Sequence, residues 1–312
     1  MKTILITASR LLNEFDRYRD PIDEAGFKII MVRDKSRVSA DHILPHAGKF
    51  DGCICGDEPF SYEVLAACAP RLKVISKWGT GMDSIDLEGA QKLGIKVCNS
   101  PGAFTVPVAE TALAFIFAFA RNTVISDREM HNGSWNRKRL SSTLNGKKLG
   151  VIGAGKIGQH LLKCASGLGL ELFANDPKPL ARDFIEKYHV SQVSLTELLE
   201  VSDYVSCCCD LNTSSYHLIA SGELRQMKNT AILINVARGP VVDEKALPAA
   251  LKAGEIGGAG LDVFELEPLP DDSPLRGFDN VIMSPHNASS DPECYDWVQK
   301  NTIRNCIDNL QD

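Results

Sequence analysis

The chain has 312 residues, of which 44% are hydrophobic and 24% charged, and its formal net charge is −6. These values predict a globular protein long enough for two domains. The negative charge argues against nucleic acid or an anionic membrane surface as the main partner. The most apolar run, residues 111–120, is half the length of about 20 residues that a membrane-spanning helix needs, so we expect a buried helix there.

The first residues, MKTILITASR, predict a strand rather than a signal peptide, whose long apolar core and small-residue cleavage site they lack. The ten cysteines include no pair of C-x₂-C motifs, so the sequence predicts no metal site. Five of them lie in apolar runs typical of buried strands, where cysteine packs as a small hydrophobic residue: Cys53, Cys55, Cys207, Cys208 and Cys209. We therefore expect a reducing, cytoplasmic location.

Strand-like and helix-like segments alternate over the first hundred residues. Short apolar, β-rich segments predict strands at 2–7, 27–32, 51–56, 72–78 and 95–100. Helical patterns fall between them, at about 12–25, 40–49, 61–68 and 84–93. This alternation is typical of a parallel sheet covered by helices, and nearly continuous apolarity is typical of strands buried on both faces.

A long helix over 105–131, with Pro107 in its first turn, precedes a second series of strands. These strands are expected at 148–153, 170–176, 203–209, 230–237, 257–264 and 280–285. The sequence therefore predicts an α/β protein with two doubly wound parallel-sheet domains, Rossmann-like or flavodoxin-like, and a cleft between them. The predicted domains are 1–100 plus 288–312 for the substrate, and 101–287 for the nucleotide.

The stretch VIGAGKIG places Gly153, Gly155 and Gly158 in the spacing G-x-G-x-x-G between a predicted strand and a predicted helix. In this context the glycines allow a tight turn, backbone approach to a pyrophosphate, and close packing of helix on strand. Asp176 ends the next strand, at about the 20-residue separation expected of a carboxylate that binds the adenosine ribose. Its charge would repel a 2′-phosphate, so NAD is favoured over NADP; Lys178 weakens this preference without reversing it.

Charged residues follow three strands of the second series. LINVARGP supplies Arg238, LDVFELEP supplies Asp262, Glu265 and Glu267, and SPHNAS supplies His286. Ligands bind beyond the carboxyl ends of strands in doubly wound sheets. Our hypothesis is that Arg238 anchors an acid through its carboxylate and keto group, while His286, held by Glu267, exchanges a proton during hydride transfer. The alternatives are a surface salt-bridge arginine, a structural histidine and a solvated loop carboxylate.

These stretches resemble the D-isomer-specific 2-hydroxyacid dehydrogenase family, especially its phosphoglycerate dehydrogenase branch. The resemblance covers nearly the whole chain and rests on SKWGTGMDSIDLEGAQKLGIKV, VIGAGKIGQ followed by Asp176, LINVARGPVVDEKAL, GAGLDVFELEP and SPHNAS. It implies an NAD-dependent enzyme that interconverts a small D-2-hydroxy acid and its 2-keto acid, in which Arg238 binds the substrate and Glu267 orients His286. It also implies a homodimer through the helix that follows Ala103.

The resemblance further implies a set of binding residues. Besides the glycine loop, the cofactor would meet Lys156, Ile157, Asp176, Val236, Ala237 and Asp262, with Asp262 facing the nicotinamide amide. The substrate would contact the G-T-G turn of the first domain, Gly79, Thr80 and Gly81, and the indole of Trp78 beside it. Packing against the long helix is the alternative role of Trp78.

Two stretches depart from the family pattern. Members often carry a histidine followed by small and proline residues where this chain has 207–210, on the adenine side of the cofactor. Phosphoglycerate-type members also place an arginine after the third strand of the first domain. Here Gly56 stands at that place with Asp57 and Glu58 next, which disfavours a phosphorylated substrate.

Two rival interpretations have the same fold. The first is an NAD(H)-sensing, corepressor-like binding protein, which would keep the glycine loop and the catalytic residues; the acidic composition counts against it. The second is a formate dehydrogenase, which is disfavoured because those enzymes carry glutamine where Glu267 stands.

Overall fold

The computed structural model describes residues 1–34 and 38–311 and contains two parallel sheets, one of five strands and one of seven. This confirms the predicted class, an α/β protein with two doubly wound sheets. The chain divides into two compact units, Met1–Phe104 with Ser290–Asp312, and Thr105–Ser289. The turn at 101–104 groups with the first unit, because the long helix starts only at Thr105. Each unit is described by itself.

The sheet of the first unit has the strand order β2-β1-β3-β4-β5. Its strands are β1 (Thr3–Ile6), β2 (Lys28–Met31), β3 (Gly52–Cys55), β4 (Val74–Lys77) and β5 (Lys96–Cys98). All are parallel, and Ile4 of β1 lies opposite Gly52 of β3. The chain changes its direction of travel across the sheet between β1 and β3, which is the kind of position where doubly wound sheets bind ligands.

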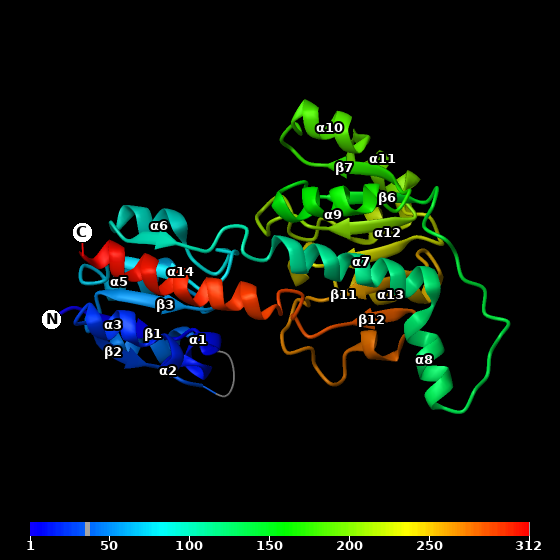
Figure 1. Ribbon diagram of the computed structural model, residues 1–312. Coiled ribbons are helices and arrows are strands. Elements are labelled where there is room, and N and C mark those ends of the chain that lie inside the picture. Colours follow the sequence, from blue (N-terminus) through cyan, green and yellow to red (C-terminus); the bar gives the residue numbers. More distant parts are fainter. Residues whose placement is uncertain (35–37, 312) are drawn as a thin grey trace. The chain divides into compact units, whose positions relative to one another are not determined.

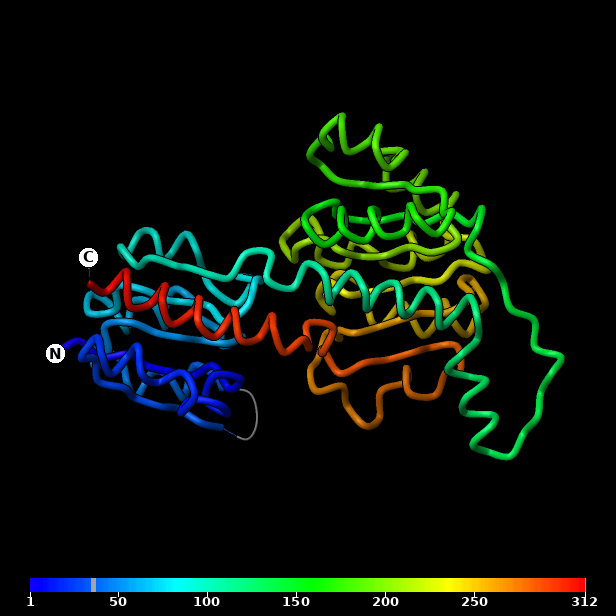
Figure 2. Tube along the Cα trace, in the orientation of Figure 1, coloured from blue at the N-terminus to red at the C-terminus, as the bar shows by residue number. Residues whose placement is uncertain are grey.

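The final helix of the chain completes the first unit. The helices of this unit are α1 (Ser9–Asn13), α2 (Phe15–Tyr18), α3 (Asp20–Glu24), α4 (Ala40–Ile43), α5 (Tyr62–Cys68), α6 (Leu87–Lys92) and α14 (Pro292–Gln311), with a 3₁₀ turn at Leu44–His46. Helix α14 packs against β3, β4 and β5, and Figure 2 shows this last segment running beside the first strands. Gly52 makes the packing possible, because a Cβ added there would lie 2.8 Å from Leu310 Cδ1.

The sheet of the second unit has the order β12-β11-β10-β9-β6-β7-β8. Figure 1 labels four of these strands, β12, β11, β6 and β7. Its strands are β6 (Lys148–Ile152), β7 (Glu171–Asn175), β8 (Val190–Gln192), β9 (Tyr204–Cys207), β10 (Ile232–Asn235), β11 (Gly258–Leu261) and β12 (Val281–Met283). The chain moves outward from β6 to β8 and then from β9 to β12 on the other side. Since parallel crossovers are right-handed, these two directions place helices on opposite faces, and the switch point lies between β6 and β9.

Helices of the second unit cover this sheet. They are α7 (Thr105–Arg121), α8 (Thr123–His131), α9 (Lys156–Ser166), α10 (Arg182–Tyr188), α11 (Leu195–Val201), α12 (Ser221–Gln226) and α13 (Ala246–Ala253), with 3₁₀ turns at Gly239–Val241 and Pro274–Gly277. Helix α7 packs against α9, β10 and β11, whereas α11 packs against β6 and β7. Gly260 of β11 leaves room for the ring of Phe115, whose Cγ would lie 2.8 Å from an added Cβ.

Several predicted elements differ from the observed ones. The helix expected over 105–131 is two helices, because Asn122 takes a left-handed conformation with φ of 55°. The helical pattern at 12–25 forms three short helices, and the strand β8 was missed. Cys53, Cys55 and Cys207 are buried as predicted, but β9 ends at Cys207, so 208–209 are half-buried loop residues.

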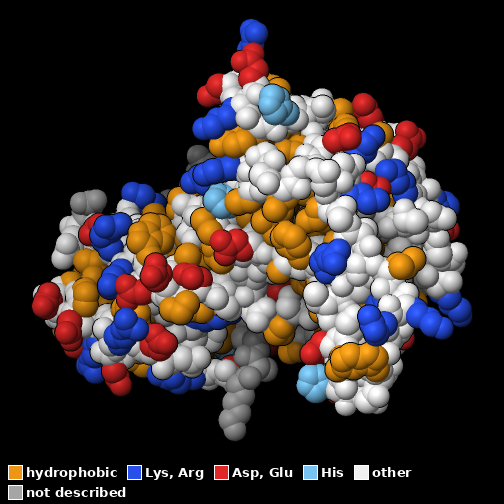
Figure 3. Space-filling model, turned by 45° about the vertical axis from the view of Figure 1, so that its right-hand side comes forward, with side chains coloured by type: hydrophobic (Ala, Val, Ile, Leu, Met, Phe, Trp, Pro, Cys, Tyr) orange, Lys and Arg blue, Asp and Glu red, His pale blue; other side chains and the backbone are white. Residues whose placement is uncertain are grey.

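Two features of the structure concern the prediction that neither nucleic acid nor a membrane is the main partner: the surface charge and the length of the apolar helices. Acidic and basic side chains are interspersed over the face that Figure 3 shows. Within residues 1–34 and 38–311, no single helix combines the length and apolarity of a membrane span; α7 and α8 satisfy those criteria only as a pair bent by 64°.

Candidate active site

The residues expected to perform chemistry lie at three strand ends of the second unit. Arg238 follows β10, Glu267 lies in the loop after β11, and His286 lies in the loop after β12. These strands are parallel neighbours in the order β12-β11-β10, so their carboxyl ends meet along one edge of the sheet. The structure therefore brings Glu267 and His286 into contact and places Arg238 at the adjoining strand end.

Glu267 and His286 form a close pair. Oε2 of Glu267 lies 2.7 Å from Nδ1 of His286, while Oε1 accepts the backbone N–H of Phe264 at 3.0 Å. An ionised carboxylate only accepts hydrogen bonds, so Nδ1 of His286 carries the hydrogen and donates it. The proton that the ring can exchange is then the one on Nε2.

Asp262 holds the loop that carries His286. Asp262 is 1% exposed, and its carboxylate accepts hydrogen bonds from Ser284 Oγ at 2.6 Å and from the backbone of Asn287 and Ala288 at 3.0 Å each. His286 itself has φ of 49°, a left-handed conformation that is uncommon for residues other than glycine and that clusters at functional sites. The carboxylate predicted to face the nicotinamide is thus engaged with the histidine loop, and its contact with the cofactor stays a prediction.

A turn closed by Asn235 presents Arg238. The buried Asn235 side chain accepts the N–H of Ala237 at 3.1 Å and donates to the carbonyl of Arg238 at 2.9 Å. Nη1 of Arg238 donates to the Ala237 carbonyl at 3.0 Å. Gly239 follows, and a Cβ added to it would lie 1.9 Å from the carbonyl carbon of Phe264. The arginine turn and the loop after β11 therefore touch backbone to backbone.

The glycine loop is crowded where the fold needs glycine and open where a ligand would approach. Gly153 has φ of 88°, and a Cβ added there would lie 2.4 Å from Cys209 Cα. A Cβ at Gly158 would lie 2.2 Å from the carbonyl oxygen of Gly153. Apart from Gly155 and its two chain neighbours, no atom of the described residues comes within 4 Å of the same position at Gly155, directly before α9 begins at Lys156. This arrangement fits a pyrophosphate at the helix N-terminus.

Asp176 lies beside that loop. It directly follows β7, its Oδ2 accepts the N–H of Ala154 at 2.8 Å, and its Oδ1 accepts the N–H of Lys178 at 2.8 Å. A carboxylate in this place fits the diol of an adenosine ribose. The other expected cofactor contacts also belong to the second unit: Ile157 in the first turn of α9, and Val236 and Ala237 in the turn before Arg238.

The cysteines at the end of β9 lie at the switch point of this sheet. Burial raises the pKa of the Cys208 thiol to about 12 and that of Cys209 to about 11. Thiols with such pKa values stay protonated near neutral pH and are poor nucleophiles. We therefore assign these side chains to packing around the glycine loop.

The turn expected to meet the substrate follows β4 in the first unit. Gly79 has φ of 107°, and Oγ1 of Thr80 donates to the carbonyl of Ser100 at 3.1 Å. The carbonyl of Thr80 accepts the side chain of Asn99. These bonds fix the shape of the turn; its contact with substrate, including that of Gly81, stays a prediction.

Trp78 packs within its own unit. It is 8% exposed, its ring centroid lies 5.3 Å from that of Tyr295 and 5.7 Å from that of Phe104, and Nε1 donates to Gln299 at 2.9 Å. The packing partners are thus Phe104, just before the long helix, and α14. A substrate contact of Trp78 stays a prediction.

A buried carboxyl group covers Gly56. A Cβ added to Gly56 would lie 3.3 Å from Oε1 and 3.4 Å from Oε2 of Glu58. Glu58 is 4% exposed, its Oε2 has no hydrogen-bond partner among the described residues, and burial raises its pKa. Lys77 lies nearby but pairs with Asp57 at 2.8 Å. The space into which a side chain at position 56 would project is therefore filled by an acid.

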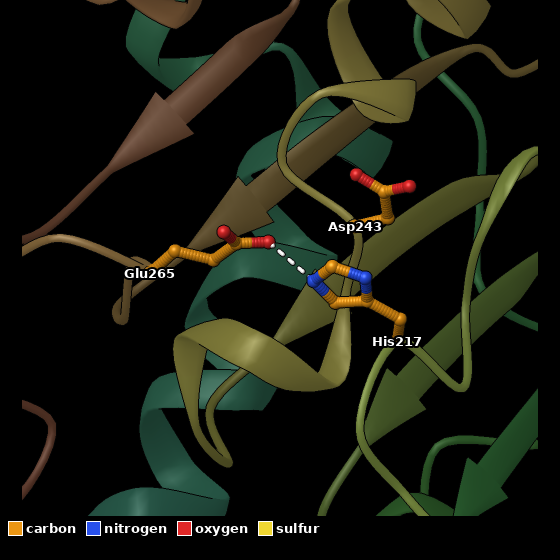
Figure 4. Close-up of side chains that lie close together, drawn as sticks. All are labelled: His217, Asp243 and Glu265. Atoms are coloured by element: carbon orange, nitrogen blue, oxygen red, sulfur yellow. Dashed lines mark hydrogen bonds and ion pairs between the residues drawn. The ribbon is translucent and has the colours of Figure 1, made fainter.

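A hydrogen-bond network outside the predicted site lies next to the loop after β11. His217, Asp243 and Glu265 offer ligand atoms within 4.8 Å of one another (Figure 4). Oε1 of Glu265 already accepts from His217 Nε2 at 2.8 Å and from the N–H of Glu244 at 3.0 Å. Oδ1 of Asp243 accepts the N–H groups that begin α13. Since Glu265 Oε1 and Asp243 Oδ1 already accept these hydrogen bonds, we describe His217 and Glu265 as a hydrogen-bonded pair with Asp243 beside it, rather than as a metal centre.

Sequence reasoning missed several residues of this region. Asn235 could have been found, since a polar residue that ends a buried strand beside an arginine turn commonly closes the turn. His217 and Glu244 carried no local signal, because their partner Glu265 is 48 residues away from His217 and 21 from Glu244.

Comparison with known proteins gives one family match and several similar relatives. Residues 113–288 match the family described as D-isomer specific 2-hydroxyacid dehydrogenase, NAD binding domain. A glyoxylate reductase from Korarchaeum cryptofilum is 38% identical over 290 residues, which cover 91% of this chain and 87% of the relative. A D-3-phosphoglycerate dehydrogenase from Methanocaldococcus jannaschii is 41% identical over 227 residues, which cover 72% of this chain and 43% of the relative. A solved D-lactate dehydrogenase from Aquifex aeolicus, complexed with NAD and lactic acid, is similar with a TM-score of 0.86 and 29% identity, covering 99% of this chain and 95% of the other.

Proposed function

The chain belongs to the D-isomer-specific 2-hydroxyacid dehydrogenase family of NAD-binding oxidoreductases, and on that premise we propose that it interconverts a small, unphosphorylated 2-keto acid and its D-2-hydroxy acid. The observation that carries the proposal is the 2.7 Å contact between His286 Nδ1 and Glu267 Oε2, at the strand end next to that of Arg238. Reduction of a 2-keto acid needs a proton donor and a cation for the carboxylate, and these side chains supply both.

His286 supplies the proton in the direction of reduction. The glycine loop and Asp176 would hold NADH, which when bound would supply the hydride for the carbonyl carbon. As the carbonyl oxygen gains negative charge, Nε2–H of His286 donates its proton to it and a hydroxyl group forms. Glu267 stabilises the imidazolium beforehand and keeps Nδ1 protonated afterwards, so the ring ends as the neutral Nδ1–H tautomer. Oxidation runs through the same steps in reverse.

Arg238 orients the substrate. Its planar guanidinium can donate two parallel hydrogen bonds, to the carboxylate and to the neighbouring keto oxygen. The same positive charge stabilises the negative charge that develops on that oxygen during reduction. The turn closed by Asn235 fixes the backbone position from which the Arg238 side chain extends.

The acidic cover of Gly56 supports an unphosphorylated substrate. A phosphate dianion near Glu58 and Asp57 would meet carboxyl groups where an arginine would be required. The similarity to a glyoxylate reductase favours glyoxylate and other small 2-keto acids as the substrate class.

A panel of keto acids tests this function. We expect NADH oxidation with glyoxylate or hydroxypyruvate, and a kcat/KM at least about 100-fold lower with phosphohydroxypyruvate, because a charged group left without a partner costs about 2–3 kcal/mol. Steady-state loss of NADH absorbance measures both. Preference for the phosphorylated acid would overturn the role given to Glu58. Absence of turnover with every acid would favour the NAD(H)-sensing binding protein.

An Asp176→Ala variant is expected to lose its preference for NADH over NADPH. The carboxylate would bind the ribose diol of NADH and repel the 2′-phosphate of NADPH, so its removal should change the ratio of the two kcat/KM values by about 10–100-fold. Coenzyme-dependent kinetics with one keto acid measure this ratio. Lys178→Ala is the matched control and should favour NADH slightly further, because it removes a nearby cation. An unchanged ratio in Asp176→Ala would place the ribose elsewhere.

A homodimer through the helix after Ala103 remains a proposal. Helix α7 presents Phe117 with 41% of its surface exposed, and the segment after α8 exposes Trp135 by 75% and Leu140 by 90%. Contact surfaces are marked by contiguous exposed apolar patches, so these side chains are candidates for the dimer contact.

A further inference from the structure

We propose that His217 is a positioning residue, which holds the loop after β11 so that Glu267 stays paired with His286 beside Arg238. The inference rests on the proposed function but concerns a side chain that belongs to none of the reacting or binding groups assigned above. It is carried by three connected sets of contacts within the second unit.

The ring of His217 fixes the position of Glu265. Nε2 lies 2.8 Å from Oε1 of Glu265 (Figure 4). The same oxygen also accepts the N–H of Glu244 at 3.0 Å. In return, the N–H of Glu265 donates to Oε2 of Glu244 at 2.6 Å. We call this pair of reciprocal hydrogen bonds the Glu244–Glu265 clasp. Its two carboxylates repel each other, and burial together with the charges of Glu265 and Glu267 raises the pKa of Glu244. A donor from His217 offsets that repulsion and keeps the clasp closed.

The backbone of His217 holds the turn that carries Arg238. Its N–H donates to the carbonyl of Pro240, two residues after the arginine, at 2.8 Å. His217 has φ of 49° and stacks on Tyr216 with 4.1 Å between ring centroids, so its own orientation is well constrained. One residue therefore contacts the arginine turn through its backbone and the glutamate loop through its ring.

The loop after β11 transmits this constraint to the catalytic pair. Phe264, next to Glu265, donates its N–H to Oε1 of Glu267 at 3.0 Å and packs against the backbone of Gly239. A displacement of residues 264–265 therefore moves the carboxylate relative to His286. Because misplacement of reacting groups by about 1 Å can lower a rate by about 100-fold, this clasp affects catalysis without touching substrate.

Three variants separate positioning from a general structural role. His217→Leu removes the donor and keeps a bulky side chain; His217→Gln restores an N–H that can reach Glu265. His131→Leu is the matched control, since it removes an exposed histidine 3.4 Å from Asp127 on α8. We expect kcat of His217→Leu to fall by about 10–100-fold, with KM for glyoxylate and the Kd for NADH within about threefold. His217→Gln should recover most of the loss, and His131→Leu should behave as the unaltered protein.

The titration midpoint of His286 distinguishes positioning from a general structural role, because a loss of stability alone would leave that midpoint unchanged. When Glu267 shifts away, the imidazolium loses its carboxylate, so its titration midpoint falls by about one pH unit. The alkaline limb of kcat/KM for reduction should then move to lower pH in His217→Leu and return in His217→Gln. Proton NMR of the histidines, seven in the unaltered chain and six in each His217 variant, measures the midpoint directly and requires no turnover.

Failure of this inference can be told apart from failure of the proposed function. If the unaltered protein reduces keto acids and His217→Leu keeps its kcat and its His286 midpoint, only the positioning role is wrong. If no keto acid is reduced, the proposed function fails, while the NMR midpoints still decide whether His217 acts on His286. Thermal melting checks folding; should His217→Leu not fold, Glu265→Gln, which weakens the acceptor, should shift the midpoint in the same direction by less. Loss of activity with a chelator, restored by Zn²⁺, would also overturn the inference, because the cluster would then be a metal site.

Discussion

A His286→Gln variant is expected to lose about 10²–10⁴-fold in kcat for keto-acid reduction. Glutamine can donate a hydrogen bond to the carbonyl oxygen, but its amide cannot release a proton as the hydroxyl group forms. Affinity for NADH should change by less than about threefold, because the glycine loop and Asp176 are untouched. Steady-state kinetics with glyoxylate measure the first effect, and NADH fluorescence titration measures the second.

The pH profile identifies the reason for that loss. Reduction by the unaltered protein should decline as pH rises, since His286 must be protonated to act, and the residual activity of His286→Gln should lack this alkaline limb. Glu267→Gln is the companion variant: it keeps a hydrogen-bond acceptor but removes the charge, so the limb should move to lower pH. Full turnover by His286→Gln, with normal NADH binding, would eliminate His286 as the acid.

Arg238→Lys is expected to lower kcat/KM for the keto acid by about 10²–10³-fold even though the charge is kept. An ammonium group is a point donor and cannot donate two parallel hydrogen bonds to a carboxylate and its neighbouring keto oxygen. The turn itself should persist, because Asn235 bonds to backbone atoms at positions 237 and 238 that the substitution leaves in place. The measurement is the rate against keto-acid concentration at saturating NADH.

The control for this prediction is the same substitution at Arg225, an exposed residue at the end of α12. Arg225→Lys should leave both kcat and KM unchanged. Arg238→Gln, which removes the charge as well as the fork, should lose more than Arg238→Lys. If Arg238→Lys retained its kcat/KM, the substrate carboxylate would be bound by another group.

The strand ends at which the candidate site residues lie could be predicted from the sequence, because each residue closely follows a predicted strand. Arg238, Glu267 and His286 each come shortly after an apolar strand, and parallel strands place such residues along one edge. The glycine spacing could be interpreted for the same reason, since a strand precedes it and a helix follows it. These features are local in sequence, so periodicity and spacing were enough to predict them.

What escaped prediction depends on contacts between distant segments. The clasp of Glu265 joins residues from three separate loops, and no spacing rule links them. The break at Asn122 also lacked a signal, because neither glycine nor proline marks it and its left-handed backbone is visible only in the structure. Strand β8 has one apolar residue, Val190, followed by two polar ones, so no apolar run marks it in the sequence.

The Glu58 side chain that covers Gly56 limits which substitutions could change the substrate specificity towards phosphorylated acids. An arginine introduced alone at that position would form an ion pair with Glu58, only a few ångströms from where its side chain would start. The guanidinium would then already be paired and would bind a phosphate weakly. Removing Glu58 alone would add no cation for a phosphate, since the nearby Lys77 already pairs with Asp57 at 2.8 Å. Acceptance of a phosphorylated acid therefore needs both changes, and neither single substitution is expected to remove the proposed preference for unphosphorylated acids.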